Sequence, residues 1–228
     1  MTTVVILAVA LFLAVVIGPQ IWVRQTISRN GQDRPDLPGT GGELAQHLIE
    51  RFNLDGVTVE ITDKGDHYDP DDKAVRLIKQ HHDGRSLSAV AVAVHEVSHA
   101  LQDSRGEPML ALRQRLAKFA ATTDRFAGWF FIAAPVLAAL ARVPAAFFGV
   151  IAIGVALLGI RVIVNLVTLP VEFDASFAKA MPILEEGKYL DDADLPAARN
   201  VLRAAAFTYV AGALMSLVNV AYWIRLLR

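Results

Sequence analysis

The sequence predicts a mostly helical protein with a small α+β part and about four membrane-spanning helices. Three observations lead to this prediction. Apolar residues make up 54% of the 228 residues and the mean hydropathy is positive, so the chain is more apolar than an ordinary soluble domain. These residues gather in four runs, and a polar segment of mixed charge separates the first run from the second. Within that segment, helix and strand patterns alternate.

The first element is an N-terminal membrane anchor over residues 1–23. The run from Thr3 to Val23 is apolar apart from Gln20, and about 20 such residues are needed to span a bilayer. No basic residue precedes the run and no small-residue cleavage signal follows it. We therefore expect an uncleaved anchor and not a signal peptide.

The polar segment over residues 24–125 is expected to form the α+β part. Apolar residues recur at helical spacing in its first third and then alternate with polar residues, as in a half-buried strand. Its expected elements are a helix over residues 44–52, strands over residues 57–61 and 74–78, and a helix that begins near Leu87 with Ser86 as its N-cap.

The remaining apolar runs predict a transmembrane hairpin over residues 126–168 and a last span over residues 205–228. Between them, residues 169–204 form a polar stretch in which Pro170 is expected to break or restart a helix. Most basic residues next to the predicted spans lie in the polar segments, and few lie on the opposite side of the membrane. The positive-inside rule then places these segments in the cytoplasm, in a multi-pass membrane protein.

Charge and cysteine content exclude some functions. The net charge is −1, so no strongly basic surface favours nucleic acid as a partner. The chain has no cysteine, which excludes disulfides and thiolate metal sites. A bound metal would have to use histidine, aspartate or glutamate side chains.

A His-Glu-x-x-His pattern stands on the helix that follows Ser86. His95 and His99 are four residues apart, so both imidazoles leave the same face of that helix. Neutral imidazole is a good zinc ligand, and Glu96 between them is placed to act on a water that the metal activates. The plainer alternative is a pair of surface histidines on an amphipathic helix.

Several further motifs occur around this pattern, and together they resemble the bacterial membrane neutral zinc metallopeptidases of the YugP type. The similarity extends from about Thr40 to the C-terminus. The motifs are, in order, Asp66-His67-Tyr68-Asp69-Pro70, Val75-Arg76-Leu77, Gly84-Arg85-Ser86-Leu87, residues 95–102 and residues 169–176. A more distant similarity is to the HtpX-type membrane proteases. The chain departs from the family at Ser98, where a glycine is usual; this substitution is expected to alter packing and not to prevent metal binding.

The resemblance implies a zincin-like catalytic domain of the gluzincin type with one Zn²⁺ per chain. It also implies that the membrane is the inner membrane of a bacterium. By similarity to the Glu-x-x-Ala element of HtpX-type enzymes, Glu172 is the expected third ligand. Asp174 is the alternative, either as a ligand or as a group that orients a ligand imidazole. A solvated carboxylate in a first helical turn remains the plainer interpretation of Glu172.

The implied activity is that of a membrane-embedded, zinc-dependent endopeptidase in which Glu96 is the general base. His67 or Tyr68 would stabilise the oxyanion, unless both merely belong to a turn. The strand near Val75–Ile78 is expected to receive the peptide as an added strand. A non-catalytic zinc-binding scaffold and a zinc hydrolase of non-peptide amides remain alternatives. The expected partners are a peptide or protein substrate and the lipid bilayer; the sequence does not specify the substrate's identity or the oligomeric state.

Overall fold

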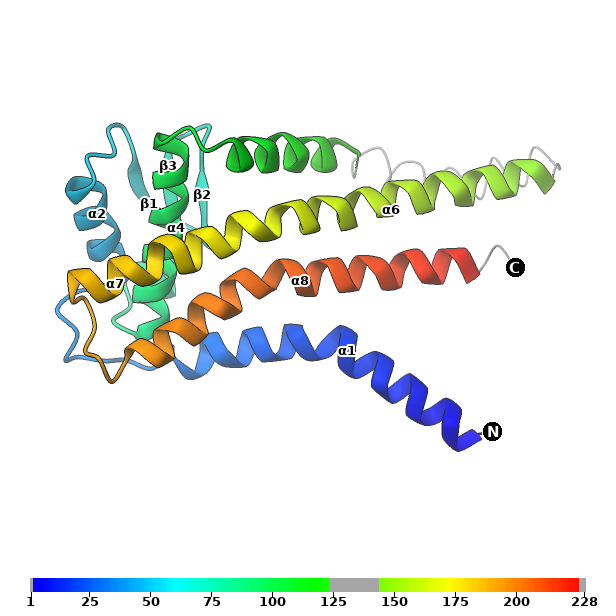
Figure 1. The fold of residues 1–228 in the computed structure, drawn as a ribbon, viewed down its shortest axis with the longest axis horizontal. Coiled ribbons are helices and arrows are strands. Elements are labelled where there is room, and N and C mark those ends of the chain that lie inside the picture. Colours follow the sequence, from blue (N-terminus) through cyan, green and yellow to red (C-terminus); the bar gives the residue numbers. More distant parts are fainter. Residues whose placement is uncertain (1, 124–143, 226–228) are drawn as a thin grey trace. The chain divides into compact units, whose positions relative to one another are not determined.

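A computed structural model describes residues 2–123 and 144–225, which are mostly helical with one small sheet (Figure 1). The helices are α1 (Thr2–Arg29), α2 (Gly41–Arg51), α3 (Lys79–His82), α4 (Leu87–Ser104), α6 (Pro144–Phe173), the π-helix η1 (Asp174–Ala180), α7 (Met181–Gly187) and α8 (Leu195–Arg225). Residues 108–123 are helical as well. The strands are β1 (Thr58–Thr62), β2 (His67–Asp69) and β3 (Ala74–Ile78).

The structure contradicts the predicted membrane spans. Helices of 28, 30 and 31 residues, α1, α6 and α8, do form at three of the expected places. Each of them, however, continues beyond its apolar run into charged residues such as Arg24, Glu172 and Arg203. Over the described residues, no helix combines the length and the apolarity that a membrane crossing requires.

This finding overturns two predictions that depended on the apolar runs. The first is a multi-span protein with about four transmembrane helices, and the second is a multi-pass location in the inner membrane with the catalytic part facing the cytoplasm. The first arm of the predicted hairpin, residues 126–141, lies outside the described residues.

The chain divides into two compact units, one of which carries the sheet and every candidate site residue. That unit is made of Pro19–Ala111 and Leu169–Thr208. The other takes the described residues among 2–18, 112–168 and 209–225. Two segments that are far apart in the sequence therefore build the sheet-bearing unit together.

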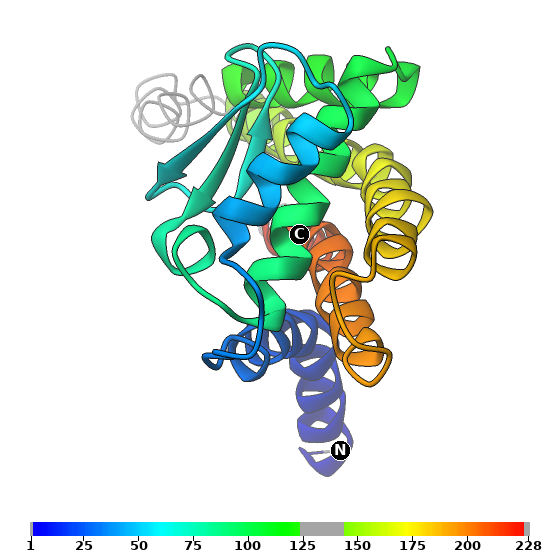
Figure 2. The same cartoon turned by 90° about the vertical axis from the view of Figure 1, so that its left-hand side faces the viewer.

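The sheet has the strand order β1-β3-β2, with β1 parallel and β2 antiparallel to the central strand β3. Helices α2 and α4 lie against one face (Figure 2), onto which Tyr68, Val75 and Leu77 point and where they are buried. Because β3 is paired on both sides, it has no free edge. The expectation that the strand near Val75–Ile78 receives a peptide is therefore wrong.

Helix α4 begins at Leu87, as the sequence predicted. The Ser86 hydroxyl caps it by accepting a hydrogen bond from the Ala89 backbone N–H at 3.1 Å. All residues from Leu87 to Gln102 are buried, because α2, the sheet and η1 pack around a helix built mainly of valine and alanine. The helix is thus a rigid central support for the side chains it carries.

Pro170 does not break the helix that leads to Glu172. Helix α6 runs through Pro170 to Phe173, and the irregularity begins one residue later, where the backbone enters the π-helix η1. The Met181 N–H bonds to the Ser176 carbonyl, five residues back, which is the π-helical pattern. Segment η1 packs against α4, so Glu172 and the first residues of η1 are brought to the histidine-bearing helix.

Candidate metal centre

The side chains of His95, His99 and Glu172 meet in the interior of the sheet-bearing unit. One potential ligand atom from each lies within 4.8 Å of the other two. The Oε2 atom of Glu172 is 3.2 Å from Nε2 of His95 and 3.4 Å from Nε2 of His99. The three residues are 1–3% exposed, so this is an enclosed cluster and not a surface patch of histidines.

The two helices place these groups for simple geometric reasons. One turn of α4 separates His95 from His99, and their ring centroids are 4.8 Å apart with the planes at 80°. Glu172 comes from the last turn of α6, which η1 then holds against α4. The structure therefore brings together the residues that the sequence paired by spacing and by family resemblance.

The charge of Glu172 suits a cation. Burial alone would raise the pKa of this carboxyl, but attraction to His99 and hydrogen bonds with both imidazoles lower the pKa well below its usual range. The carboxylate is therefore kept ionised inside the protein. Two imidazole nitrogens and one carboxylate oxygen are the donor set of a catalytic zinc site with three protein ligands, so the residues present fit the metal.

The Nδ1 atom of each imidazole, which faces away from Glu172, is hydrogen-bonded to a neighbouring polar side chain. Nδ1 of His99 donates to Oε1 of Gln102 at 2.8 Å. Nδ1 of His95 lies 3.1 Å from the Ser176 hydroxyl, which donates its own hydrogen to the Leu202 carbonyl and thus accepts from the ring. Both rings are in this way turned so that Nε2 faces Glu172.

Asp174 stands outside the three-residue cluster. Its Oδ2 atom accepts a hydrogen bond from Nε2 of Gln102 at 2.7 Å and forms an ion pair with Lys179. Burial raises the pKa of Asp174, but Lys179 and Gln102 outweigh it and the pKa is lowered. Asp174 contacts Gln102 and Lys179 and not an imidazole of the cluster in the described contacts, so its role as a ligand or as an orienting group stays a prediction.

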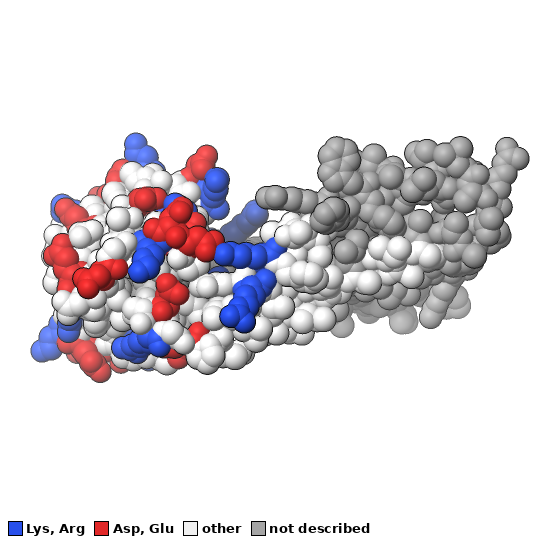
Figure 3. Space-filling model, turned by 90° about the horizontal axis from the view of Figure 1, so that it is seen from above, with Lys and Arg blue, Asp and Glu red and all other residues white. Residues whose placement is uncertain are grey.

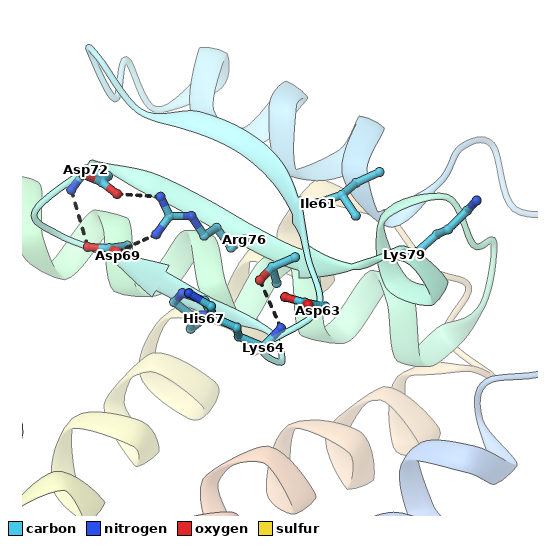
Figure 4. A pocket seen from close by; sticks show the side chains of 9 residues that line it. Ile61, Asp63, Lys64, His67, Asp69, Asp72, Arg76 and Lys79 are labelled. Atoms are coloured by element: carbon cyan, nitrogen blue, oxygen red, sulfur yellow. Dashed lines mark hydrogen bonds and ion pairs between the residues drawn. The ribbon is translucent and has the colours of Figure 1, made fainter. Parts of the chain in front are cut away.

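His67 and Tyr68 point to opposite faces of β2. His67 lines an open hollow of about 810 Å³ on the outer face of the sheet, where Arg76 lies between Asp69 and Asp72 (Figure 4). None of the three candidate ligands lines this hollow. Acidic and basic side chains are interspersed on the face of this unit that Figure 3 shows. The structure thus places His67 among surface ion pairs and not beside the cluster.

Tyr68 is buried against α4, where its hydroxyl donates to Asp103 at 2.9 Å. Burial, and then the bond to Asp103, raise the pKa of this phenol. Tyr68→Phe is expected to lower stability by about 1 kcal/mol and Tm by about 2–4 °C, because a hydrogen bond to a charged group is lost. The value of kcat should be retained. A large fall in kcat at unchanged Tm would indicate that Tyr68 takes part in catalysis and would contradict the structural role.

The two remaining motif residues lie inside α4. Ser98 is fully buried, and its hydroxyl donates to the Val94 carbonyl at 2.7 Å, so the side chain that replaces the family's glycine is satisfied within its own helix. Glu96 is 7% exposed and directly follows His95.

No role for Gln102, Ser176 or Lys179 was predicted from the sequence. The only available signal was their spacing from the ligands, which is ambiguous until the two helices are seen to face each other.

Comparison with known proteins agrees with this site. The family model described as "Putative neutral zinc metallopeptidase" matches residues 4–228. The chain is 34% identical over 208 residues to the "Putative membrane protease YugP" of Bacillus subtilis (strain 168), with 88% of each chain covered. No solved structure matches the chain. The chain therefore belongs to the family described as "Putative neutral zinc metallopeptidase", as its run of motifs indicated.

Proposed function

We propose that this protein is a zinc-dependent endopeptidase, in which His95, His99 and Glu172 hold one Zn²⁺ and Glu96 is the general base. The observation that carries the proposal is the buried convergence of the three ligand atoms within 4.8 Å. Both Nδ1 atoms are already held by Gln102 and Ser176, so Nε2 of each ring is the nitrogen left for a metal, beside the Glu172 carboxylate. Two imidazole nitrogens and one carboxylate oxygen are a usual donor set for catalytic zinc.

The residues of the chain have distinct tasks in peptide hydrolysis. A zinc ion held by His95, His99 and Glu172 would polarise the scissile carbonyl and make water more acidic. Glu96 takes a proton from the attacking water and passes it to the leaving amine. Glu96 is buried on α4 directly after His95, so the helix holds its backbone close to the ligand histidines.

The strand arrangement suggests where an extended peptide would lie. Strand β2 is an edge strand of the three-stranded sheet, and it contacts α4 through the Tyr68–Asp103 hydrogen bond. An extended peptide that pairs with β2 would therefore run beside the histidine-bearing helix. This assigns to β2 the peptide-binding role that the sequence had suggested for β3.

The proposed activity is tested with casein and a degenerate peptide library. We expect cleavage that stops when a chelator removes the metal and returns when Zn²⁺ is added back. Cleavage that is indifferent to the chelator would contradict the zinc mechanism. A protein that binds zinc but cleaves no peptide would indicate a scaffold, and one that cleaves only fatty-acid amides would indicate a hydrolase of non-peptide amides.

A further inference from the structure

The π-helical turn that follows Glu172 brings together two charged residues that an α-helix would separate. In a π-helix, residues five apart come onto the same side of the helix. Asp174 and Lys179 are five apart in η1, and their side chains form an ion pair. Lys179 is only 9% exposed and also pairs with Glu107 at 3.0 Å. The buried lysine is thus held between two partly exposed carboxylates, those of Asp174 and Glu107.

This ion pair is connected to the metal cluster through Gln102 and not directly. The Nε2 atom of Gln102 donates to Asp174 at 2.7 Å and to the Val171 carbonyl at 3.1 Å. Its Oε1 atom accepts from Nδ1 of His99 at 2.8 Å. Gln102 is 1% exposed, so its amide is shielded from water even though the Asp174 side chain is 37% exposed.

The chemistry of the acceptors fixes which way the Gln102 amide points. The carboxylate of Asp174 and the carbonyl of Val171 can only accept hydrogen bonds. A flipped amide would set its oxygen against both of them and leave its NH₂ group facing His99. The amide oxygen is therefore held toward His99, whose hydrogen must sit on Nδ1, and Nε2 of that ring keeps its lone pair for the cluster.

We propose that Gln102 is a positioning residue for His99 and that the Asp174–Lys179 pair acts on the metal site only by clamping Gln102. The inference rests on the proposed zinc site and adds to it the route by which a charged pair outside the cluster controls one ligand ring. His95 is oriented separately through Ser176, so the route through Gln102 serves His99 alone.

The test is a double-mutant cycle on zinc affinity, measured by competition with a chelator. Gln102→Met keeps the length of the side chain and removes both polar groups, and we expect it to weaken zinc binding by ~10–100-fold. Asp174→Ala should weaken binding of the parent by a smaller factor. Because Asp174 acts through Gln102, Asp174→Ala should add less than about twofold to Gln102→Met. Equal losses in the two backgrounds would overturn the proposal, as would a Gln102→Met protein that binds zinc like the parent.

Two controls separate positioning from general damage. Asp174→Asn retains an oxygen that accepts from Gln102 but loses the charge that pairs with Lys179, so it should recover part of the zinc affinity that Asp174→Ala loses. Ser104→Ala removes a hydroxyl on the same helix that bonds only to the Leu101 carbonyl in the described contacts, and it should leave the affinity unchanged. A parent protein that binds no zinc would instead refute the proposed function, so the two failures are distinguishable.

A second measurement does not depend on the folding of Gln102→Met. Nitrogen NMR of the zinc-loaded parent should show His99 with its hydrogen on Nδ1 and protected from exchange, and Asp174→Ala should speed that exchange. A hydrogen on Nε2 of His99, or exchange unaffected by Asp174→Ala, would contradict the clamp.

Discussion

Glu96→Gln is expected to lower peptide turnover by ~10²–10⁴-fold while the protein keeps its zinc. The amide has nearly the shape of the carboxylate but cannot take a proton from water. The three candidate ligands are untouched, and Glu96 is not among the atoms that converge. The measurement is kcat on a casein-derived peptide together with the zinc content of the same sample.

The matched control is Glu50→Gln, the same chemical change on the exposed side of α2. It should alter neither kcat nor zinc content. If Glu96→Gln cleaves as fast as the parent, the peptidase mechanism is wrong and the scaffold interpretation gains support. If Glu96→Gln loses its zinc, Glu96 is a ligand and the assignment of the metal site must change.

Glu172→Ala is expected to remove zinc under conditions in which Asp174→Ala retains it. Removing Glu172 takes away the only carboxylate of the cluster and leaves two imidazoles, fewer than the three protein ligands usual for catalytic zinc. Asp174 touches Gln102 and Lys179, so its loss should cost at most the ~10–100-fold typical of groups that orient a ligand. Zinc content after dialysis against a chelator of moderate strength distinguishes the two variants.

Glu172→Gln refines this prediction because it keeps the size of the side chain and removes its charge. We expect it to lose most of its zinc as well, since the ionised carboxylate is what makes the buried cluster suited to a cation. A Glu172→Ala protein that holds zinc as tightly as the parent, with the metal lost from Asp174→Ala, would reverse the two assignments.

Local patterns in the sequence predicted the elements that depend on neighbouring residues. The cap at Ser86, the start of α4 at Leu87 and the strand over residues 74–78 are confirmed, because capping and alternation act within one element. The four-residue spacing of His95 and His99 likewise fixed their shared helix face. The family resemblance is also confirmed.

Features that depend on contacts between distant segments were not predictable in this way. The short strand β2 and the strand order β1-β3-β2 follow from long-range pairing, so the free edge was assigned to the wrong strand. The π-helix after Glu172 arises where η1 packs on α4, and with it the connection from Lys179 to Gln102. The apolar runs were given too much weight, since no helix among the described residues combines the length and the apolarity of a membrane span.

The most direct test of the metal centre is the position of the ion in a crystal soaked with zinc, located by anomalous scattering. We expect one strong peak per chain at about 2.0–2.2 Å from Nε2 of His95, Nε2 of His99 and a carboxylate oxygen of Glu172. A peak bound by Asp174 with Glu172 remote, or a cluster that stays empty while zinc binds elsewhere on the chain, would contradict it.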